Sequence, residues 1–266
     1  MIAVARFADR ILHHRIMIRA MVVRQLQSRY AGTWGGTIWA VIHPVALVAT
    51  YWFVFSIGFK VRSVGSSPFL LFFVCGLTPW MLFSEAVNGS AVSVVGNPHL
   101  VKRVAFPTEL LPVVSLVSAL VTHLLLLGLV VVLLAFYGIA LTWNVFQLFY
   151  YVAATSLFAL GVGWLVAAFN VFFRDLGQIV TVLLGIWFWL TPIVWPAEML
   201  PSQAQPWLMA NPAVYLVAGF RDALLGGQAI WDRLGEAAYF WVVCGIVLVV
   251  GAQVFRRLKP EFAEVL

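Results

Sequence analysis

Long apolar stretches alternate with short polar breaks along almost the whole chain. Each stretch holds about 20 residues with few charges, which is enough to cross the ~30 Å hydrocarbon layer of a membrane as a helix. A charge in that layer costs roughly 2.5–3.5 kcal/mol, and the charged residues accordingly lie in the breaks. The pattern predicts an all-α polytopic membrane protein with six transmembrane helices, near 36–57, 69–91, 110–136, 146–169, 177–195 and 235–255.

The positions of the basic residues predict how these helices are oriented. Cytoplasmic loops carry an excess of Lys and Arg, so both termini are expected in the cytoplasm. An even number of spans is consistent with this orientation. Residues 1–35 would then form a cytoplasmic interfacial helix, 36–255 the transmembrane domain and 256–266 a cytoplasmic tail. Twelve of the sixteen basic residues would face the cytoplasm: Arg6, Arg10, Arg15, Arg19, Arg24, Arg29, Lys102, Arg103, Arg174, Arg256, Arg257 and Lys259.

Composition narrows the class further. With 266 residues, 63% of them hydrophobic, and a mean hydropathy of +1.00, no stretch is left for a separate soluble domain. The net charge of +6 could indicate nucleic-acid binding, but the basic residues flank apolar spans and so indicate membrane orientation. Cys75 and Cys244 lie within apolar runs, which predicts reduced, buried thiols and no disulfide.

The basic N-terminal segment, residues 1–35, has two interpretations. A helix lying on the membrane surface would show a clean apolar stripe, and this segment does not. It is therefore either a membrane-surface anchor or a helix that partly contacts a protein. On a helical wheel one face carries Arg6, Arg10, His13 and Arg24, and nearly the opposite face carries Arg15 and Arg19.

Residues 196–234 form the longest non-spanning segment, and they are unusually apolar for an outside loop. The run 207–220 is too short to span, and Asn211-Pro212 splits it into two. One interpretation is a re-entrant pair of half-helices that gates an outer exit, because such backbone is tolerated only when buried in protein or lining a wet cavity. The other is an interfacial helix lying flat. The predicted gate residues are Trp207, Asn211, Pro212 and Tyr215.

Motifs for covalent chemistry are absent from the sequence. No G-x-x-x-x-G-K-[ST] loop occurs, and the five His residues show no metal-ligand spacing. Three ionisable residues lie inside predicted spans: His43, Glu85 and His123. They fit hydrogen bonds between helices better than the relay of an ion-coupled carrier. We therefore expect that the chain is not an enzyme and holds no cofactor or metal.

Aromatic residues are the richer signal, since Trp, Tyr and Phe make up 15% of the chain. Apolar faces of sugar rings pack on aromatic rings, so an aromatic pathway would let a carbohydrate chain slide. The alternative is that these rings face lipid, as in the interfacial belt of many membrane proteins. Two clusters in the outer half exceed that belt: Tyr51, Trp52, Phe53 and Phe55 in the first span, and Trp187, Phe188, Trp189 and Trp195 in the fifth.

The cytoplasmic break at 96–107 is short, basic and bracketed by prolines. A brief helix held there against the second and third spans could act as a lever for a cytoplasmic partner. A plain basic loop is the alternative. The residues expected to contact the partner are Asn97, His99, Lys102 and Arg103.

Over essentially its whole length the chain resembles the membrane subunits of ABC exporters for bacterial polysaccharides, of the O-antigen and teichoic-acid type. Each matching motif is short, but their order and spacing together are specific. The motifs are Arg29 to Trp39 with His43-Pro44, Asn97 to Pro107, Glu109 to Pro112, Phe172 to Leu176, Leu190 to Pro196, Asn211-Pro212 with Phe220-Arg221, and Phe255 to Phe262.

The resemblance implies a homodimer in the bacterial inner membrane whose first and fifth spans line a channel for lipid-linked polysaccharide. It also implies two copies of a separate ATP-binding subunit, which would hold ATP and Mg²⁺ and contact residues 96–107 and the N-terminal helix. Arg174, at the cytoplasmic entrance, could meet the diphosphate of the substrate, or pair with Asp175, or simply anchor topology. The alternative function is an ABC permease for a smaller lipid, lipo-oligosaccharide or drug.

Overall fold

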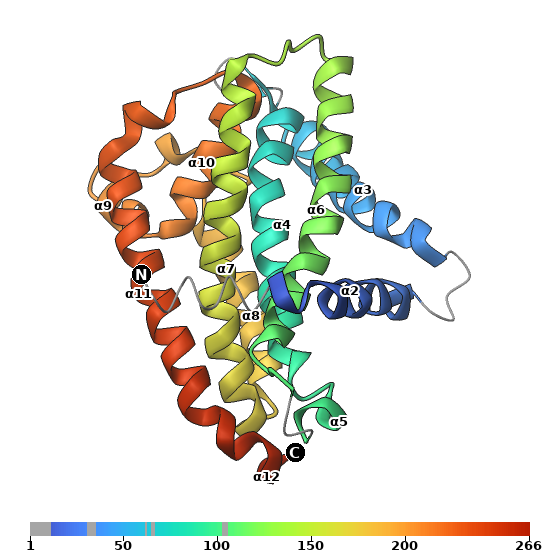
Figure 1. Cartoon of the computed structure of the whole chain (residues 1–266). Coiled ribbons are helices and arrows are strands. Elements are labelled where there is room, and N and C mark those ends of the chain that lie inside the picture. The colour runs from blue at the N-terminus through green and yellow to red at the C-terminus, as the bar shows by residue number, and fades with distance from the viewer. Residues whose placement is uncertain (1–11, 31–35, 62, 65–66, 103–105) are drawn as a thin grey trace.

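The computed structural model describes residues 12–30, 36–61, 63–64, 67–102 and 106–266. Figure 1 shows long helices running side by side, with one helix lying across them, in agreement with the predicted helical class. The elements are α2 (Arg15–Tyr30), η1 (Gly36–Ile38), α3 (Trp39–Trp52), η2 (Phe53–Gly58), β1 (Ser63–Val64), β2 (Ser67–Pro68), α4 (Phe69–Ser93), α5 (Pro98–Val101), α6 (Leu110–Phe136), η3 (Trp143–Phe146), α7 (Gln147–Phe172), α8 (Leu176–Leu190), η4 (Ala197–Met199), α9 (Gln205–Met209), α10 (Pro212–Leu225), η5 (Ile230–Arg233), α11 (Leu234–Leu258), η6 (Lys259–Glu261) and α12 (Phe262–Val265).

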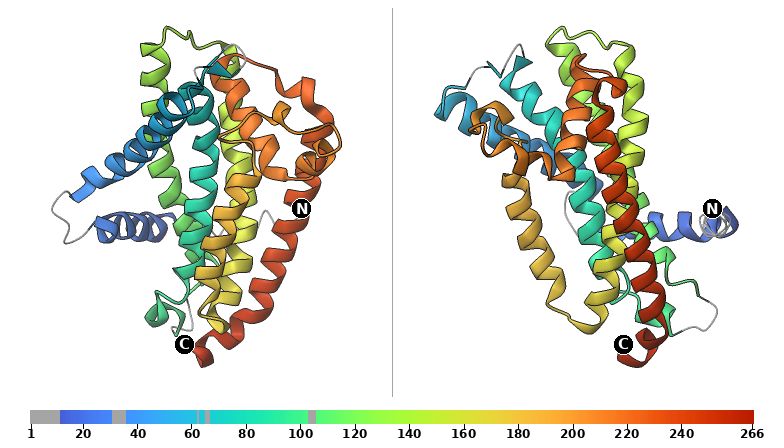
Figure 2. Two further views of the ribbon diagram at one scale, coloured as in Figure 1. Left: turned by 180° about the vertical axis from the view of Figure 1, so that it is seen from behind. Right: turned by 90° about the vertical axis from the view of Figure 1, so that its left-hand side faces the viewer.

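Helices α4, α6, α7 and α11 form the body of the bundle. In it α4 packs on α6 and α7, and α7 also packs on α11 (Figures 1 and 2). Among the described residues, four segments are long and apolar enough to cross a membrane, and these are the ones that contain these four helices. Four of the six predicted spans therefore have the expected length.

The first and fifth predicted spans are shorter helices. The first continues from α3 into the π-helical turn η2, and the apolar helix there covers Ile42–Gly58. The fifth, α8, ends at Leu190 and does not reach residue 195. Pro192 explains this end, because proline disfavours helical backbone in the residue before it and has no N–H to donate. The count of six spans therefore remains a prediction.

Small residues let the long helices approach closely. A Cβ atom added to Gly251 of α11 would lie 2.3 Å from the backbone oxygen of Gly161 in α7. One added to Gly163 would lie 2.7 Å from the Ser90 Oγ of α4. Such contacts are typical of membrane helices, which associate by close packing of small side chains. The interior around them is apolar, and the free thiols of Cys75 and Cys244 are buried in it as predicted.

Helix α2 lies across the bundle and packs on α6 (Figure 1). Ile18 and Val22 are buried, and Gln25 Oε1 accepts a hydrogen bond from Ser118 Oγ at 3.3 Å. Part of the basic N-terminal helix therefore contacts protein, which is the second of its two interpretations. Its position at a membrane surface remains a prediction, and residues 1–11, with Arg6 and Arg10, lie outside the described part.

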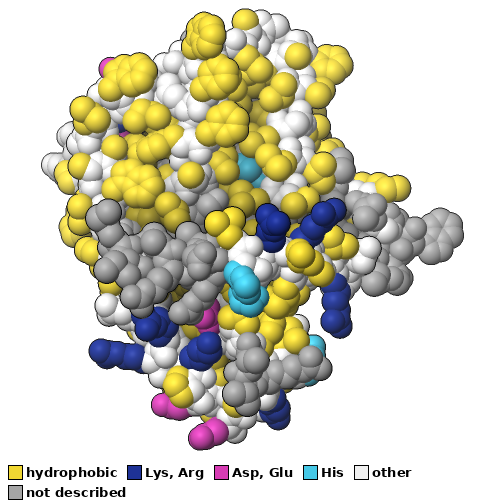
Figure 3. All heavy atoms as spheres, in the orientation of Figure 1, with side chains coloured by type: hydrophobic (Ala, Val, Ile, Leu, Met, Phe, Trp, Pro, Cys, Tyr) yellow, Lys and Arg dark blue, Asp and Glu magenta, His cyan; other side chains and the backbone are white. Residues whose placement is uncertain are grey.

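The two ends of the bundle differ in charge. On the face shown in Figure 3, the upper part is hydrophobic, and Lys and Arg gather around α2 and below it. We call the lower end, with α5, α12 and the turn between α7 and α8, the basic end, and the opposite end the far end. The far end carries η3 and the antiparallel pair β1–β2, in which Ser63 pairs with Pro68. The described Lys and Arg residues of the basic end are Lys102, Arg174, Arg256, Arg257 and Lys259, and His99 lies beside them.

Candidate functional site

The two predicted aromatic clusters meet where the end of α3 lies beside α8. The Tyr51 ring centre is 6.0 Å from that of Phe188 and 6.3 Å from that of Trp189. It also stacks on Phe73 of α4, with 4.8 Å between the ring centres. These separations are those of favourable aromatic pairs. Tyr51 therefore joins two clusters that lie far apart in the sequence.

The other aromatic residues of the first cluster divide into inward and outward rings. Phe55 is partly buried and stacks on Phe69, with ring centres 5.2 Å apart. Trp52 and Phe53, in contrast, are 40% and 58% exposed. One side of this segment thus packs on the protein, and the other side presents free aromatic surface.

The aromatic run of α8 divides in the same way. Phe188 is only 6% exposed, and its ring centre lies 6.0 Å from that of Trp80. Trp189, in contrast, is 53% exposed. Trp187 is partly buried and packs edge-on against Phe83 at 5.3 Å. Successive residues of a helix point about 100° apart, so three adjacent rings cannot all face one pathway. The role of these rings in lining a channel remains a prediction.

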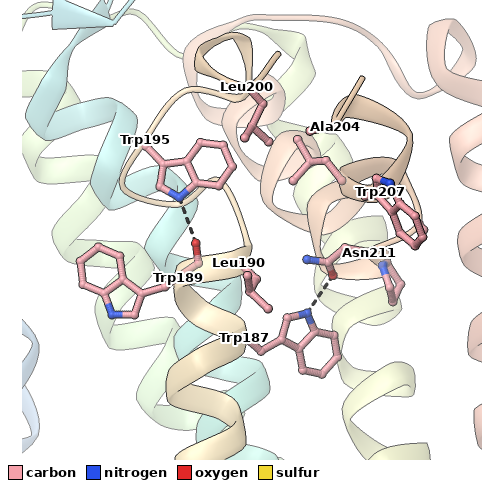
Figure 4. A pocket seen from close by; sticks show the side chains of 11 residues that line it. Trp187, Trp189, Leu190, Trp195, Leu200, Ala204, Trp207 and Asn211 are labelled. Carbon is pink, nitrogen blue, oxygen red and sulfur yellow. Dashed lines mark hydrogen bonds between the residues drawn. The ribbon is translucent and has the colours of Figure 1, made fainter. Parts of the chain in front are cut away.

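An open cavity of about 490 Å³ lies beside the end of α8 (Figure 4). It brings predicted channel residues of the fifth span together with predicted gate residues of the following loop. Its wall is largely apolar and rich in Trp. The lining residues are Trp187, Trp189, Leu190, Trp195, Leu200, Ala204, Trp207, Leu208, Ala210, Asn211 and Pro212.

Asn211 organises one wall of this cavity. Its Oδ1 accepts hydrogen bonds from Trp187 Nε1 at 2.8 Å (Figure 4) and from the backbone N–H of Ala213 at 3.0 Å. Its Nδ2 donates to Thr191 Oγ1 at 3.0 Å. Asn211 is therefore the N-cap of α10 and also a bridge to the end of α8. The helix is interrupted at Asn211-Pro212, as expected. Pro212 is well suited to its place as the first residue of α10.

The predicted gate residues lie in very different environments. Trp207 of α9 is 82% exposed, whereas Tyr215 of α10 is buried. The hydroxyl groups of Tyr215 and Tyr150 are 2.9 Å apart, and Trp241 Nε1 donates to the Tyr150 hydroxyl at 2.7 Å. Helix α10 is thus tied to α7 and α11 by polar as well as apolar contacts. The role of these residues in gating remains a prediction.

Arg221 of α10 is the residue whose role the sequence did not reveal. It is not among the twelve basic residues expected to face the cytoplasm, and its guanidinium group donates to three backbone carbonyl oxygens. These belong to Phe72, Pro192 and Ile193, at 3.0, 2.8 and 2.7 Å. An Arg in the most apolar part of a loop was the available signal, because such charges need dedicated partners.

A small ionic cluster at the far end follows Arg221. Arg233 lies 3.0 Å from Asp222 and 3.2 Å from Glu236. Burial raises the pKa of Asp222 above its usual range, and the charge of Arg233 offsets only part of this rise. Two carboxylates therefore offset the charge of Arg233 at the far end.

The basic end holds the predicted entrance and coupling residues. Arg174 is exposed in the turn between α7 and α8, and Asn170 fixes this turn. Asn170 Nδ2 donates to the Ala91 oxygen at 2.8 Å, and its Oδ1 accepts from the Gly177 N–H at 2.9 Å. The first turn of α8 is thereby held against the end of α4.

The predicted lever contains the short helix α5. Asn97 precedes it and donates from Nδ2 to the Ser93 oxygen at 2.9 Å, which fixes α5 to the end of α4. His99 and Lys102 are exposed. Arg103 lies outside the described residues, and its role in coupling stays a prediction.

The C-terminal segment packs behind this lever. Phe262 of α12 is fully buried, with ring centres 5.3 Å from Phe255 and 6.1 Å from Phe172, and α12 also contacts α5. Lys259 Nζ lies 2.6 Å from Glu109 Oε2 at the start of α6. The elements of the basic end therefore form one connected unit.

A family model described as ABC-2 type transporter matches residues 17–225 of the chain. The chain belongs to this family. It is therefore a multi-pass membrane subunit of an ABC transporter, a class that works with an ATP-binding subunit. The resemblance found in the sequence is confirmed at this level.

Relatives of this ABC-2 type chain are named as export or transport proteins. It is 30% identical to the O-antigen export system permease protein RfbA of Myxococcus xanthus, over 97% of this chain and 98% of that protein. It is 28% identical to an RfbA of Klebsiella pneumoniae, covering 91% and 92% of the two chains. It is 23% identical to the polysialic acid transport protein KpsM of Escherichia coli, covering 91% and 93%.

Glu85 and His123 lie among the packed helices of this ABC-2 type chain. Among the described residues, no group of three or more His, Cys, Asp or Glu could hold a metal ion. Glu85 Oε1 accepts a hydrogen bond from Thr122 Oγ1 at 3.2 Å and so links α4 to α6, as expected of a helix–helix contact. His123 is buried with its ring edge-on to Phe220 at 5.7 Å.

Proposed function

We propose that this chain is the membrane subunit of an ATP-driven exporter that moves a lipid-linked, O-antigen-like polysaccharide from cytoplasm to periplasm through a channel formed by two copies. The observation that carries the proposal is the similarity to O-antigen permeases along almost the full length of both chains. The chain itself would do no covalent chemistry.

The aromatic surface near α3 and α8 supports a carbohydrate cargo. Trp189 lines the cavity and is exposed, and Trp52 and Phe53, which follow Tyr51 along the chain, are exposed as well. Aromatic faces attract the C–H faces of sugars without fixing one hydroxyl pattern, so a repeating chain can slide past. In the proposed dimer, these rings would face the channel.

The charge distribution supports the orientation. The basic end would be cytoplasmic by the positive-inside rule, with both termini on that side. The exposed His99 and Lys102 would then face the ATP-binding subunit, which would hold ATP and Mg²⁺. Arg174, fixed by the Asn170 turn, would meet the diphosphate of the substrate.

Co-expression with ATP-binding subunits of ABC transporters from the same organism tests the proposal. We expect a two-plus-two complex that hydrolyses ATP and that restores surface polysaccharide to a strain lacking this gene. Lys102→Glu combined with Arg103→Glu should weaken complex formation or uncouple hydrolysis from export. The control Gln228→Glu, exposed at the far end, should leave complex formation unchanged. Failure to bind any ATP-binding subunit, or export of a small lipid alone, would contradict the proposal.

A further inference from the structure

Arg221 makes an unusually complete set of contacts for a charged residue in an apolar segment. Its Nε donates to the Phe72 oxygen, its Nη1 to the Pro192 oxygen and its Nη2 to the Ile193 oxygen. The guanidinium carbon also lies 3.5 Å from the centre of the Phe72 ring, a cation–π contact. One side chain of α10 thus binds both α4 and the backbone beyond the end of α8.

The chemistry of this contact requires arginine and a glycine opposite it. Only guanidinium offers several N–H donors in a planar, fixed arrangement; an ammonium group cannot reach three diverging carbonyl oxygens in the same way. Gly76 of α4 leaves the space, since a Cβ there would lie 2.6 Å from Arg221 Nη2. The close approach of Arg221 to α4 therefore depends on both residues.

The other end of α10 is held by Asn211. This residue caps α10 and binds Trp187 and Thr191 at the end of α8. Helix α10 is thus bound at its first turn and again near its last turn to the same stretch, residues 187–193. It also packs on α4, α7 and α11 and buries most of its residues. Helix α10 and the end of α8 form one body with α4.

Helix α9, in contrast to α10, is largely exposed. Of its five residues only Leu208 is buried, while Trp207 and Met209 are 82% and 64% exposed. Residues 201–203, which precede it, are exposed as well. The hydrogen bond from Tyr239 Oη to the Ala210 oxygen, 2.7 Å long, marks the border between this exposed segment and fixed α10.

We propose that Arg221 is a positioning residue that locks α10 and the end of α8 onto α4, so that opening of the far end is confined to α9 and residues 197–210. The half of the predicted re-entrant pair that follows Asn211 is then a fixed wall, and the half that precedes it is the moving part. The lock is a property of this chain, and its role in opening rests on the proposed export function.

Hydrogen exchange measured by mass spectrometry tests the lock on the purified chain in lipid nanodiscs. Arg221→Gln should speed amide exchange in α10 and in residues 190–195 by about ten-fold or more, as expected for loss of hydrogen bonds to a charged group. Arg221→Lys should give a smaller increase. Gly76→Ala should act like Arg221→Gln, whereas Gly128→Ala, a helical glycine with no atom within 4 Å of its Cβ position, should change nothing in α10.

A second arm, on the complex with its ATP-binding subunit, tests the consequence for opening. A non-hydrolysable ATP analogue should change exchange in α9 and residues 197–210 and leave α10 protected. Arg221→Gln should keep ATP hydrolysis but lose export. Unchanged protection of α10 in Arg221→Gln, an equal increase in all helices, or an ATP response of α10 as large as that of α9 would overturn the proposal. Failure of the complex to form would refute the export function alone, because the first arm needs no partner.

Discussion

Replacing Gly251 by alanine should destabilise the protein, because the added methyl group has no room between α7 and α11. Its Cβ would lie 2.3 Å from the Gly161 oxygen and 3.5 Å from the Gly161 Cα. Both are backbone atoms, so no change of side-chain rotamer can relieve the overlap. To reach a separation of 3.0 Å, the two helices must move apart locally by at least 0.7 Å.

The size of the effect follows from the packing that this movement loses. A pair of atoms in contact gains about 0.1–0.2 kcal/mol, and a gap of 0.5–1 Å loses roughly a quarter to a half of it. Over a few tens of atom pairs the loss is about 1–3 kcal/mol, the usual cost of overpacking. For about 2 kcal/mol in a chain of this length, Tm should fall by about 4–8 °C.

The assay is thermal unfolding of the purified protein, followed by tryptophan fluorescence. Gly245→Ala is the matched control, because Gly245 lies in the same helix with no atom within 4 Å of its Cβ position. Alanine there should raise Tm slightly, since it favours helix over glycine by up to about 1 kcal/mol. If Gly251→Ala melts at or above the temperature of Gly245→Ala, the close contact of α7 with α11 is wrong.

Two further sets of substitutions test contacts at the two ends of the bundle. Lys259→Glu or Glu109→Lys alone should lower Tm by the equivalent of about 0.5–1 kcal/mol, since the ion pair is partly exposed. The double exchange should restore most of the lost stability. Additive losses in the double variant would argue against the ion pair. Asn211→Ala should cost about 2 kcal/mol, because it removes the cap of α10 and leaves the Trp187 N–H without its acceptor. Asn211→Asp, which keeps the cap but loses the donor to Thr191, should melt between wild type and Asn211→Ala, and equal melting of both variants would refute the bridging role.

The long helices could be predicted from sequence because they depend on local composition. The predicted spans 69–91 and 110–136 correspond to α4 and α6, and the spans 146–169 and 235–255 to α7 and α11, within a few residues. A run of apolar residues is enough to define such a helix. The break at Asn211-Pro212 is local in the same sense, because Asn caps and Pro opens a helix.

The arrangement of the site could not be predicted, because it depends on contacts between distant positions. Arg221 binds a carbonyl 149 positions away, at Phe72, and nothing near Arg221 in the chain indicates this partner. Likewise, the sequence shows Phe188 and Trp189 as equal aromatic neighbours. Only the packing of α8 on α4 buries the first and exposes the second.

Helix α8 is fastened to its neighbours at both ends and in between. Asn170 holds its start against the end of α4, Thr181 Oγ1 donates to Asn88 Oδ1 of α4 at 3.0 Å, and Asn211 and Arg221 hold its far end. A helix held at both ends cannot pivot about either end, so a force applied to it bends it. The compliant point of this helix is Gly185, which has no side chain and no atom within 4 Å of its Cβ position. A force applied at the basic end would therefore reach the far end as elastic curvature of α8, with the largest deflection near Gly185, between the Thr181 contact and the fixed far end.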